Sequence, residues 1–144
     1  MFSRILVLCT GNICRSPMAE ALLRDRLTQR ECGVASAGTH ALLGHPADEN
    51  ARQVMLARGL DISTHRAQQA TLELLTSADL ILTMDHTHRQ WIDGQFPQLR
   101  GRAFKLCKWN GDADVVDPYM LPLSAFEKAF EDIRTGIDEW VSRL

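Results

Sequence analysis

The chain has 144 residues, 45% of them hydrophobic and 24% charged, and its formal net charge is -2. This length fits one domain, residues 1–144, with a hydrophobic core of its own. The weakly acidic balance argues against nucleic acid as a partner, and no apolar run is long enough to insert into a membrane.

The first predicted element is a buried strand at residues 5–8, where apolar residues follow one another. The run then breaks into polar turn residues rather than a small-residue cleavage site. This favours the first strand of a cytoplasmic protein over a signal peptide. Cytoplasmic cysteines are expected to stay reduced, so a thiol can take part in chemistry. The four cysteines are Cys9, Cys14, Cys32 and Cys107.

After this strand the predicted elements alternate between helix and strand. In chain order they are a helix that starts at Pro17, a strand at 34–37, a helix between Pro46 and Gly59, a short helix at 71–78, a strand at 79–84, a helix at 85–96, a strand at 103–107 and a helix at 126–144. This order predicts an α/β fold: a four-stranded parallel open sheet with helices on both faces, a flavodoxin-like or Rossmann-like three-layer sandwich. Such sheets bind ligands at the carboxyl ends of their strands.

Residues 9–17, CTGNICRSP, have the composition of an anion-binding loop at one such strand end. Gly11 and Asn12 tolerate positive φ, so consecutive backbone N–H groups can converge on one anion. The helix that starts at Pro17 adds the partial positive charge of its N-terminus to the same point. Arg15 can bind two oxygens of a phosphate. Together these groups predict a site for a tetrahedral dianion.

Cys9 lies at the base of this predicted loop. A thiol at a helix N-terminus beside an arginine favours the thiolate form, and the hydroxyl of Ser16 can donate to that sulfur. A thiolate beneath a bound phosphoryl group is placed for in-line nucleophilic attack. A Walker loop is excluded because its Gly-Lys-Ser/Thr ending is missing. A metal-binding role for Cys9 and Cys14 lacks a matching His or Cys cluster.

CTGNICRSP resembles the signature of the low-molecular-weight protein tyrosine phosphatases, and in particular their bacterial branch. The resemblance continues along the chain at residues 36–38, 64–69, 77–85 and 117–119. It implies an enzyme, without cofactor or metal, that hydrolyses phosphotyrosine through a covalent cysteinyl-phosphate intermediate. By this resemblance, the family's nucleophile corresponds to Cys9 and its phosphate-binding arginine to Arg15. Its loop-shaping asparagine corresponds to Asn12 and its thiolate-stabilising serine to Ser16. The other phosphate-binding residues are Thr10, Gly11, Ile13 and Cys14.

A phosphate ester also needs a general acid to protonate its leaving oxygen. Pro118 biases Asp117 toward an extended backbone, whereas Asp112 and Asp114 are expected to be solvated in a polar turn. In the family that this chain resembles, one aspartate acts as both general acid and general base, and it corresponds to Asp117. The family's aromatic pocket wall matches Tyr119.

The wall opposite this aromatic residue comes, in the family, from the loop after residue 38. Many members carry an aromatic residue there, but this chain carries Leu42, as does a bacterial branch whose wall is aliphatic. The peptide preference is therefore left open, while the predicted chemistry is unchanged.

The same resemblance assigns residues behind the loop. Ser36 and His65 match positions that hydrogen-bond around Asn12 and keep the strained loop preorganised. Cys14 matches a second loop cysteine, which can capture an oxidised Cys9 as a disulfide.

The other polar and thiol groups have ordinary expected roles. Asp85 is predicted as a helix N-cap, and His86 and His88 are predicted to be solvated at the start of a polar helix. Cys32 and Cys107 are predicted to fill buried space.

Three alternative functions remain at this point. A thioredoxin-coupled arsenate reductase on the same fold needs a further cysteine pair after the third strand, and residues 83–93 contain none. A phosphoarginine phosphatase of the same family typically carries Thr where this chain has Ile13. A non-enzymatic phosphotyrosine-binding module is expected to have lost Cys9 or Asp117, and both are present.

The resemblance also implies partners and a compartment. The partner is a phosphotyrosine-containing protein, and the bacterial branch suggests a tyrosine kinase of exopolysaccharide export. The protein is expected to be a cytoplasmic monomer.

Overall fold

Four short, mostly apolar segments pair into one parallel sheet in the computed structural model, which describes residues 2–144. The strands are β1 (Arg4–Cys9), β2 (Gly33–Gly38), β3 (Leu80–Thr83) and β4 (Ala103–Lys105). They lie in the order β2-β1-β3-β4, so β1 is paired on both sides. Its register pairs Val7 with Ser36 of β2 and with Leu82 of β3. The predicted four-stranded parallel open sheet is confirmed.

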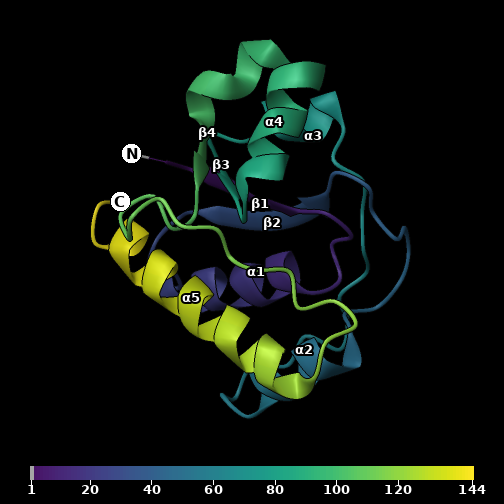
Figure 1. Cartoon of the computed structure of the whole chain (residues 1–144). Coiled ribbons are helices and arrows are strands. Elements are labelled where there is room, and N and C mark those ends of the chain that lie inside the picture. Colours follow the sequence, from purple (N-terminus) through teal and green to yellow (C-terminus); the bar gives the residue numbers. More distant parts are fainter. Residues whose placement is uncertain (1) are drawn as a thin grey trace.

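Helices cover both faces of this sheet, which gives the predicted three layers (Figure 1). One face is covered by α1 (Arg15–Arg26), α2 (Glu49–Leu56) and α5 (Leu123–Val141). The other is covered by α3 (Leu72–Thr76), α4 (His86–Gln95) and the 3₁₀ helix at Pro97–Arg102. Side chains alternate along β1, so Ile5 and Val7 enter the first core and Leu6 and Leu8 the second.

The bounds of the elements differ from the prediction by up to three residues, the most at α5, which was expected at 126–144 and spans Leu123–Val141. Two of the smaller differences have a local cause. Pro17 was expected as the first helical residue, but α1 begins two residues earlier, at Arg15. Pro17 therefore lies in the first turn, where its missing N–H still costs no intrahelical hydrogen bond. β4 ends before residue 107, because the Lys108 N–H donates to the Lys105 carbonyl in a turn.

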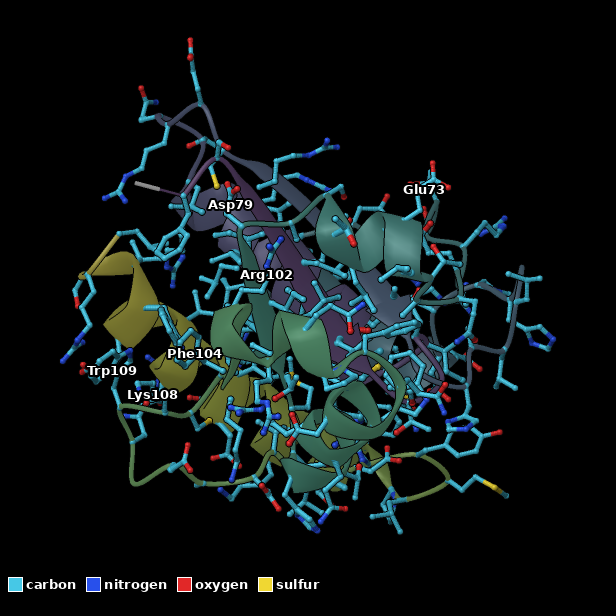
Figure 2. All side chains as sticks on the ribbon, turned by 90° about the horizontal axis from the view of Figure 1, so that it is seen from above. Glu73, Asp79, Arg102, Phe104, Lys108 and Trp109 are labelled. Carbon is cyan, nitrogen blue, oxygen red and sulfur yellow. The ribbon has the colours of Figure 1, made fainter. Side chains whose placement is uncertain are left out.

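The apolar stripe predicted for the last helix packs α5 against α1 and the sheet. Its buried members are Phe126, Phe130, Ile133, Ile137 and Trp140. Near β4, Trp140 Nε1 donates to the Leu106 carbonyl at 2.9 Å. Figure 2 shows Phe104, Lys108 and Trp109 beside α5, where the Lys108 ammonium lies 5.1 Å from each ring centroid. None of the helices within residues 2–144, α5 included, is long and apolar enough to cross a membrane.

Candidate active site

The predicted loop lies where β1 ends and α1 begins, at the carboxyl edge of the sheet. Cys9 is the last residue of β1 and Arg15 the first of α1. Between them, Asn12 has a φ of 59°, in the left-handed region. Gly38 of β2 lies against the back of the loop, and a Cβ there would be 2.3 Å from the Thr10 carbonyl oxygen. The loop can approach β2 this closely only because residue 38 has no side chain.

Asn12 is fully buried, and its side-chain amide and backbone carbonyl are hydrogen-bonded. Nδ2 donates to Ser16 Oγ at 2.7 Å and to Ser36 Oγ at 2.9 Å. Oδ1 accepts from the Gln68 N–H at 2.9 Å, and the Asn12 backbone carbonyl accepts from His65 Nε2 at 2.7 Å. Because a buried amide without partners is costly, these four bonds hold the loop in its left-handed conformation.

The thiol of Cys9 receives a hydrogen bond that this network orients. Ser16 Oγ lies 2.8 Å from Cys9 Sγ, and both residues are buried. Since Ser16 Oγ already accepts from Asn12, its own hydrogen is free to point at the sulfur. Ser36 likewise accepts from Asn12 and donates to Glu20 Oε1. The series of donors from Asn12 through Ser16 therefore ends at the sulfur.

The Arg15 guanidinium is buried and held by the protein. Nη1 donates to Asp85 Oδ2 at 2.7 Å and to the Val115 carbonyl at 2.8 Å. Within residues 2–144, both hydrogen bonds that the guanidinium donates come from Nη1, so Nε and Nη2 remain for a ligand. Nη2 lies 3.6 Å from Asp117 Oδ2. Burial alone would raise the pKa of Asp85, but hydrogen bonds from Thr87 and Arg15 outweigh it and lower this pKa to about 2. Asp85 therefore stays ionised and fixes the arginine.

His88 corrects one expectation, because it is only 1% exposed rather than solvated. Asp85 is the N-cap of α4, as predicted, and its backbone N–H donates to His88 Nδ1 at 3.2 Å. Nε2 therefore carries the hydrogen and donates to Thr10 Oγ1 at 3.0 Å. Burial lowers the pKa of His88 to about 4, so the ring is neutral. It faces inward because it shares the buried side of α4 with Ile92, one turn later.

A cavity of about 180 Å³ opens above Cys9. Its lining from the loop consists of Thr10, Gly11, Ile13, Cys14 and Arg15. Two other segments add His40, Leu42, Asp117 and Tyr119. The Tyr119 N–H donates to Asp117 Oδ1 at 3.1 Å, which orients this half-exposed carboxylate. The predicted residues outside this lining are Asn12 and Ser16 within the loop, and Ser36 and His65 behind it.

The remaining cysteines differ in their surroundings. Cys14 is buried in the loop, and burial together with the negative charge of Asp48 raises the pKa of its thiol far above the usual range. Cys107 is buried as predicted, and burial raises its pKa to about 11. Cys32 is only half-buried, so its predicted role as a buried filler is wrong; it lies in the connection between α1 and β2. All four cysteines are free thiols.

The other loop carboxylates stay out of the cavity. Asp112 is exposed, as predicted. Asp114 is instead paired, 2.8 Å from Lys105 Nζ and 2.7 Å from the Nδ1 of the exposed His86. Within residues 2–144, no group of three or more His, Cys, Asp or Glu side chains is placed to hold a metal ion.

Two glutamines that the sequence did not single out support the site. Gln68 Nε2 donates to the Ser36 carbonyl at 2.8 Å, and the residue lines a larger cavity of about 300 Å³ behind the loop, away from Cys9. Gln69 accepts from the Ala41 N–H at 3.0 Å and donates to the Thr39 carbonyl at 2.7 Å. Gln69 thus braces the segment that carries one pocket wall. Their place three and four residues after His65 was the available signal.

A buried thiol beside an arginine in an anion-binding loop is typical of cysteine-dependent phosphatases. The sequence profile described as low molecular weight phosphotyrosine protein phosphatase matches residues 4–144. The chain therefore belongs to this family and is a protein-tyrosine-phosphatase, a hydrolase with a cysteine-based mechanism. The family predicted from the sequence is confirmed.

Similar proteins cover the whole chain. The chain is 50% identical to the probable low molecular weight protein-tyrosine-phosphatase EpsP of Ralstonia nicotianae. That alignment extends over 144 residues, which are 100% of this chain and 97% of the relative. The structure of Vibrio vulnificus Wzb in complex with benzylphosphonate is 36% identical with a TM-score of 0.95, covering 100% of both chains. The YwlE arginine phosphatase from Geobacillus stearothermophilus is 34% identical with a TM-score of 0.91, covering 98% of this chain and 92% of that one. Fold similarity alone therefore does not separate a tyrosine from an arginine substrate.

Proposed function

We propose that this enzyme hydrolyses phosphotyrosine in proteins with Cys9 as nucleophile, Arg15 as phosphate clamp and Asp117 as general acid and base. The observation that carries this assignment is the single cavity that all three residues line. The sulfur and the guanidinium are buried, whereas the carboxylate is half-exposed. Residues 1–144 act as one catalytic domain.

In the first step the Cys9 sulfur forms a bond to phosphorus while the bond from phosphorus to the tyrosine oxygen breaks. Asp117 gives its proton to that oxygen, so the product leaves as a neutral tyrosine side chain. Negative charge on the transferring phosphoryl group is stabilised by the loop N–H groups and by the free nitrogens of Arg15.

In the second step Asp117 takes a proton from water as the water oxygen attacks phosphorus. The bond from phosphorus to sulfur breaks, phosphate departs and the thiolate of Cys9 is restored. Ser16 stabilises this leaving thiolate through its hydroxyl, which is 2.8 Å away. Ser36 and His65 act through Asn12, whose conformation they hold.

Phosphotyrosine is favoured over phosphoarginine by the shape of the cavity. Leu42 and Tyr119 both line it, and a flat ring can pack against such side chains. Ile13 also lines it and is buried, so a bulky aliphatic group stands where the phosphoarginine branch typically has Thr.

The physiological substrate we propose is a tyrosine kinase of exopolysaccharide export, acted on by a monomer in the cytoplasm. The resemblance to the bacterial branch of the family supports the kinase. The four free thiols fit a reducing compartment.

The deciding assay measures phosphate release from a phosphotyrosine peptide and from phosphoarginine, and arsenite formation from arsenate with thioredoxin. We expect release from the peptide, much slower release from phosphoarginine and no arsenite. Ile13→Thr is expected to shift the preference toward phosphoarginine. Absence of phosphate release from the peptide would overturn the proposal, as would arsenite formation at a comparable rate.

The covalent step is tested by acid-quenching a reaction with radiolabelled phosphopeptide. We expect label on the peptide that contains Cys9, and none in the Cys9→Ser variant. Label on Cys14 or on no cysteine would contradict the assignment of the nucleophile.

A further inference from the structure

Exposed apolar side chains are concentrated beside the cavity. Among residues 2–144, ten large apolar side chains are exposed. Leu42 and Tyr119 line the cavity itself, and the next residues along the chain, Leu43 and Met120, are 72% and 84% exposed. We call these four residues the apolar rim. Three more of the ten extend the second of these two segments: Val116, Leu121 and Leu123.

Met120 also has an unfavourable backbone. Its φ is 64°, in the left-handed region that glycine and asparagine prefer. The Leu121 N–H donates to the Pro118 carbonyl at 2.9 Å, which closes a tight turn that needs a positive φ at this position. Methionine thus strains the turn and exposes its side chain, and it stabilises nothing visible in the free protein. Such a combination points to a surface used for binding.

The charge around the rim limits what can bind there. Residues 39–47 contain no charged side chain apart from histidine, and residues 115–126 contain only Asp117. Neither segment offers a lysine or an arginine to an acidic peptide or to anionic lipid headgroups. An apolar stretch of polypeptide is the partner that this chemistry fits.

We propose that the apolar rim docks apolar residues that flank the phosphotyrosine of a protein substrate, so that this phosphatase prefers tyrosines in apolar sequence contexts. The inference rests on the proposed function. A substrate ring enters between Leu42 and Tyr119, and the residues on either side of that tyrosine then lie over Leu43 and Met120. The rim is therefore continuous with the catalytic cavity and is covered by the substrate chain itself.

The preference is tested with short phosphotyrosine peptides that differ only in their flanking residues: leucine and valine, serine and glycine, or glutamate. We expect kcat/KM to be highest for the apolar peptide, by roughly tenfold over the serine and glycine peptide, since part of each flanking side chain is buried. p-Nitrophenyl phosphate, which has no flanks, reports the proposed function separately. Equal kcat/KM for all three peptides overturns the docking proposal while leaving the proposed function intact.

Substitutions in the apolar rim test whether its residues cause this peptide preference. Met120→Gly is expected to lower kcat/KM for the apolar peptide by about threefold to tenfold, to leave p-nitrophenyl phosphate turnover unchanged, and to keep or raise the melting temperature because strain is relieved. Leu43→Ala is expected to act in the same direction. Leu56→Ala is the matched control: Leu56 is 64% exposed at the C-terminal end of α2 and does not line the cavity. An equal loss in this control overturns the proposal.

Two further measurements assign the rim to another occupant if the proposal is wrong. Light scattering that shows a dimer in the unchanged protein and a monomer in Met120→Gly would make the rim a self-association surface. Co-sedimentation with phosphatidylglycerol vesicles that Met120→Gly abolishes would assign it to lipid. We expect a monomer and no vesicle binding, and either opposite result overturns the proposal.

Discussion

The loop proposed to bind phosphate and the segment that carries Asp117 lie at the same cavity, yet they are built in opposite ways. In residues 9–16 the polar side chains that bear on the sulfur are buried and joined by hydrogen bonds. In residues 116–121 most side chains are exposed, and the Asp117 carboxylate accepts its hydrogen bond from the nearby Tyr119 N–H. One side of the cavity is rigidly supported and the other is open.

The difference between the two sides matches a difference between two parts of the substrate, the phosphate group and the leaving group. Every substrate brings the same phosphate group, and fixed donors that need no rearrangement bind and activate it best. The leaving group and its flanking residues vary among substrates, so an exposed segment with few contacts can adapt to them. Four measurements test this contrast, from the largest expected effect to the smallest.

Replacing the proposed nucleophile separates chemistry from binding on the loop side. Cys9→Ser is expected to lower turnover by at least about 10⁴-fold, because a serine hydroxyl is far less nucleophilic than a thiolate. Inorganic phosphate binding, measured by calorimetry, is expected to persist because the loop amides and Arg15 are unchanged. Loss of phosphate binding as well would show that the loop is not preorganised without its sulfur.

Removing the carboxylate proposed as the general acid tests the open side of the cavity. Asp117→Ala is expected to slow substrates with poor leaving groups by about 10²- to 10³-fold, and substrates with good leaving groups little, because only the former need a proton. The measurement is kcat across a series of aryl phosphates. Asp112→Asn, at an exposed carboxylate outside the cavity, serves as the control. Equal slowing of good and poor leaving groups by Asp117→Ala would argue against the acid role.

Gly38→Ala probes how closely the loop is supported from behind. A Cβ at this position meets the Thr10 carbonyl oxygen at 2.3 Å, so the loop must move. The expected loss is about 2 to 4 kcal/mol of unfolding free energy, with a fall in kcat. Gly33→Ala on the same strand is the matched control, because its nearest contact is 3.8 Å from the Ser3 carbonyl oxygen. Similar losses in both variants would show that the effect is a general one of β2.

The smallest expected effect is a pH dependence of stability that His88 introduces. The unfolded chain binds a proton near pH 6.5 and the folded chain only near pH 4. Stability is therefore fully present above pH 6.5 and is lost as the pH falls toward 4, by about 2 kcal/mol between pH 6.5 and pH 5. His88→Gln keeps a donor and an acceptor but cannot titrate.

Urea unfolding at several pH values checks this expectation. The curve of His88→Gln is expected to be flatter than that of the unchanged protein over this range. His86→Gln, at an exposed histidine two residues earlier, serves as the matched control. A slope that His88→Gln does not change would assign the acid sensitivity to other groups.

The elements around the loop could be predicted from sequence because their signals are local. The apolar run at residues 5–8 and the helical spacing after Pro17 indicate a strand that ends at Cys9 and a helix that follows. The positive φ expected around Gly11 and Asn12 occurs at Asn12. These inferences need only the steric preferences of neighbouring residues.

The support behind the loop could not be predicted in this way, because it is made by residues far apart in sequence. Gln68 reaches Asn12 across 56 positions, and Gly38 matters only through its approach to Thr10. The burial of His88 was missed because a histidine near the start of a polar helix is usually solvated. Its spacing from Ile92, one helical turn later, was the weak signal that it lies on the buried side.

The fixed position of Arg15 also bears on how the catalytic cycle ends. A guanidinium already held by Asp85 and Val115 needs no rearrangement to receive a dianion, so released phosphate finds the same ready site as the substrate did. If the proposed roles of Cys9 and Arg15 hold, the enzyme is expected to be inhibited by its own product. Its turnover in a cell is then expected to fall as inorganic phosphate rises, because phosphate competes with phosphorylated proteins for the same loop.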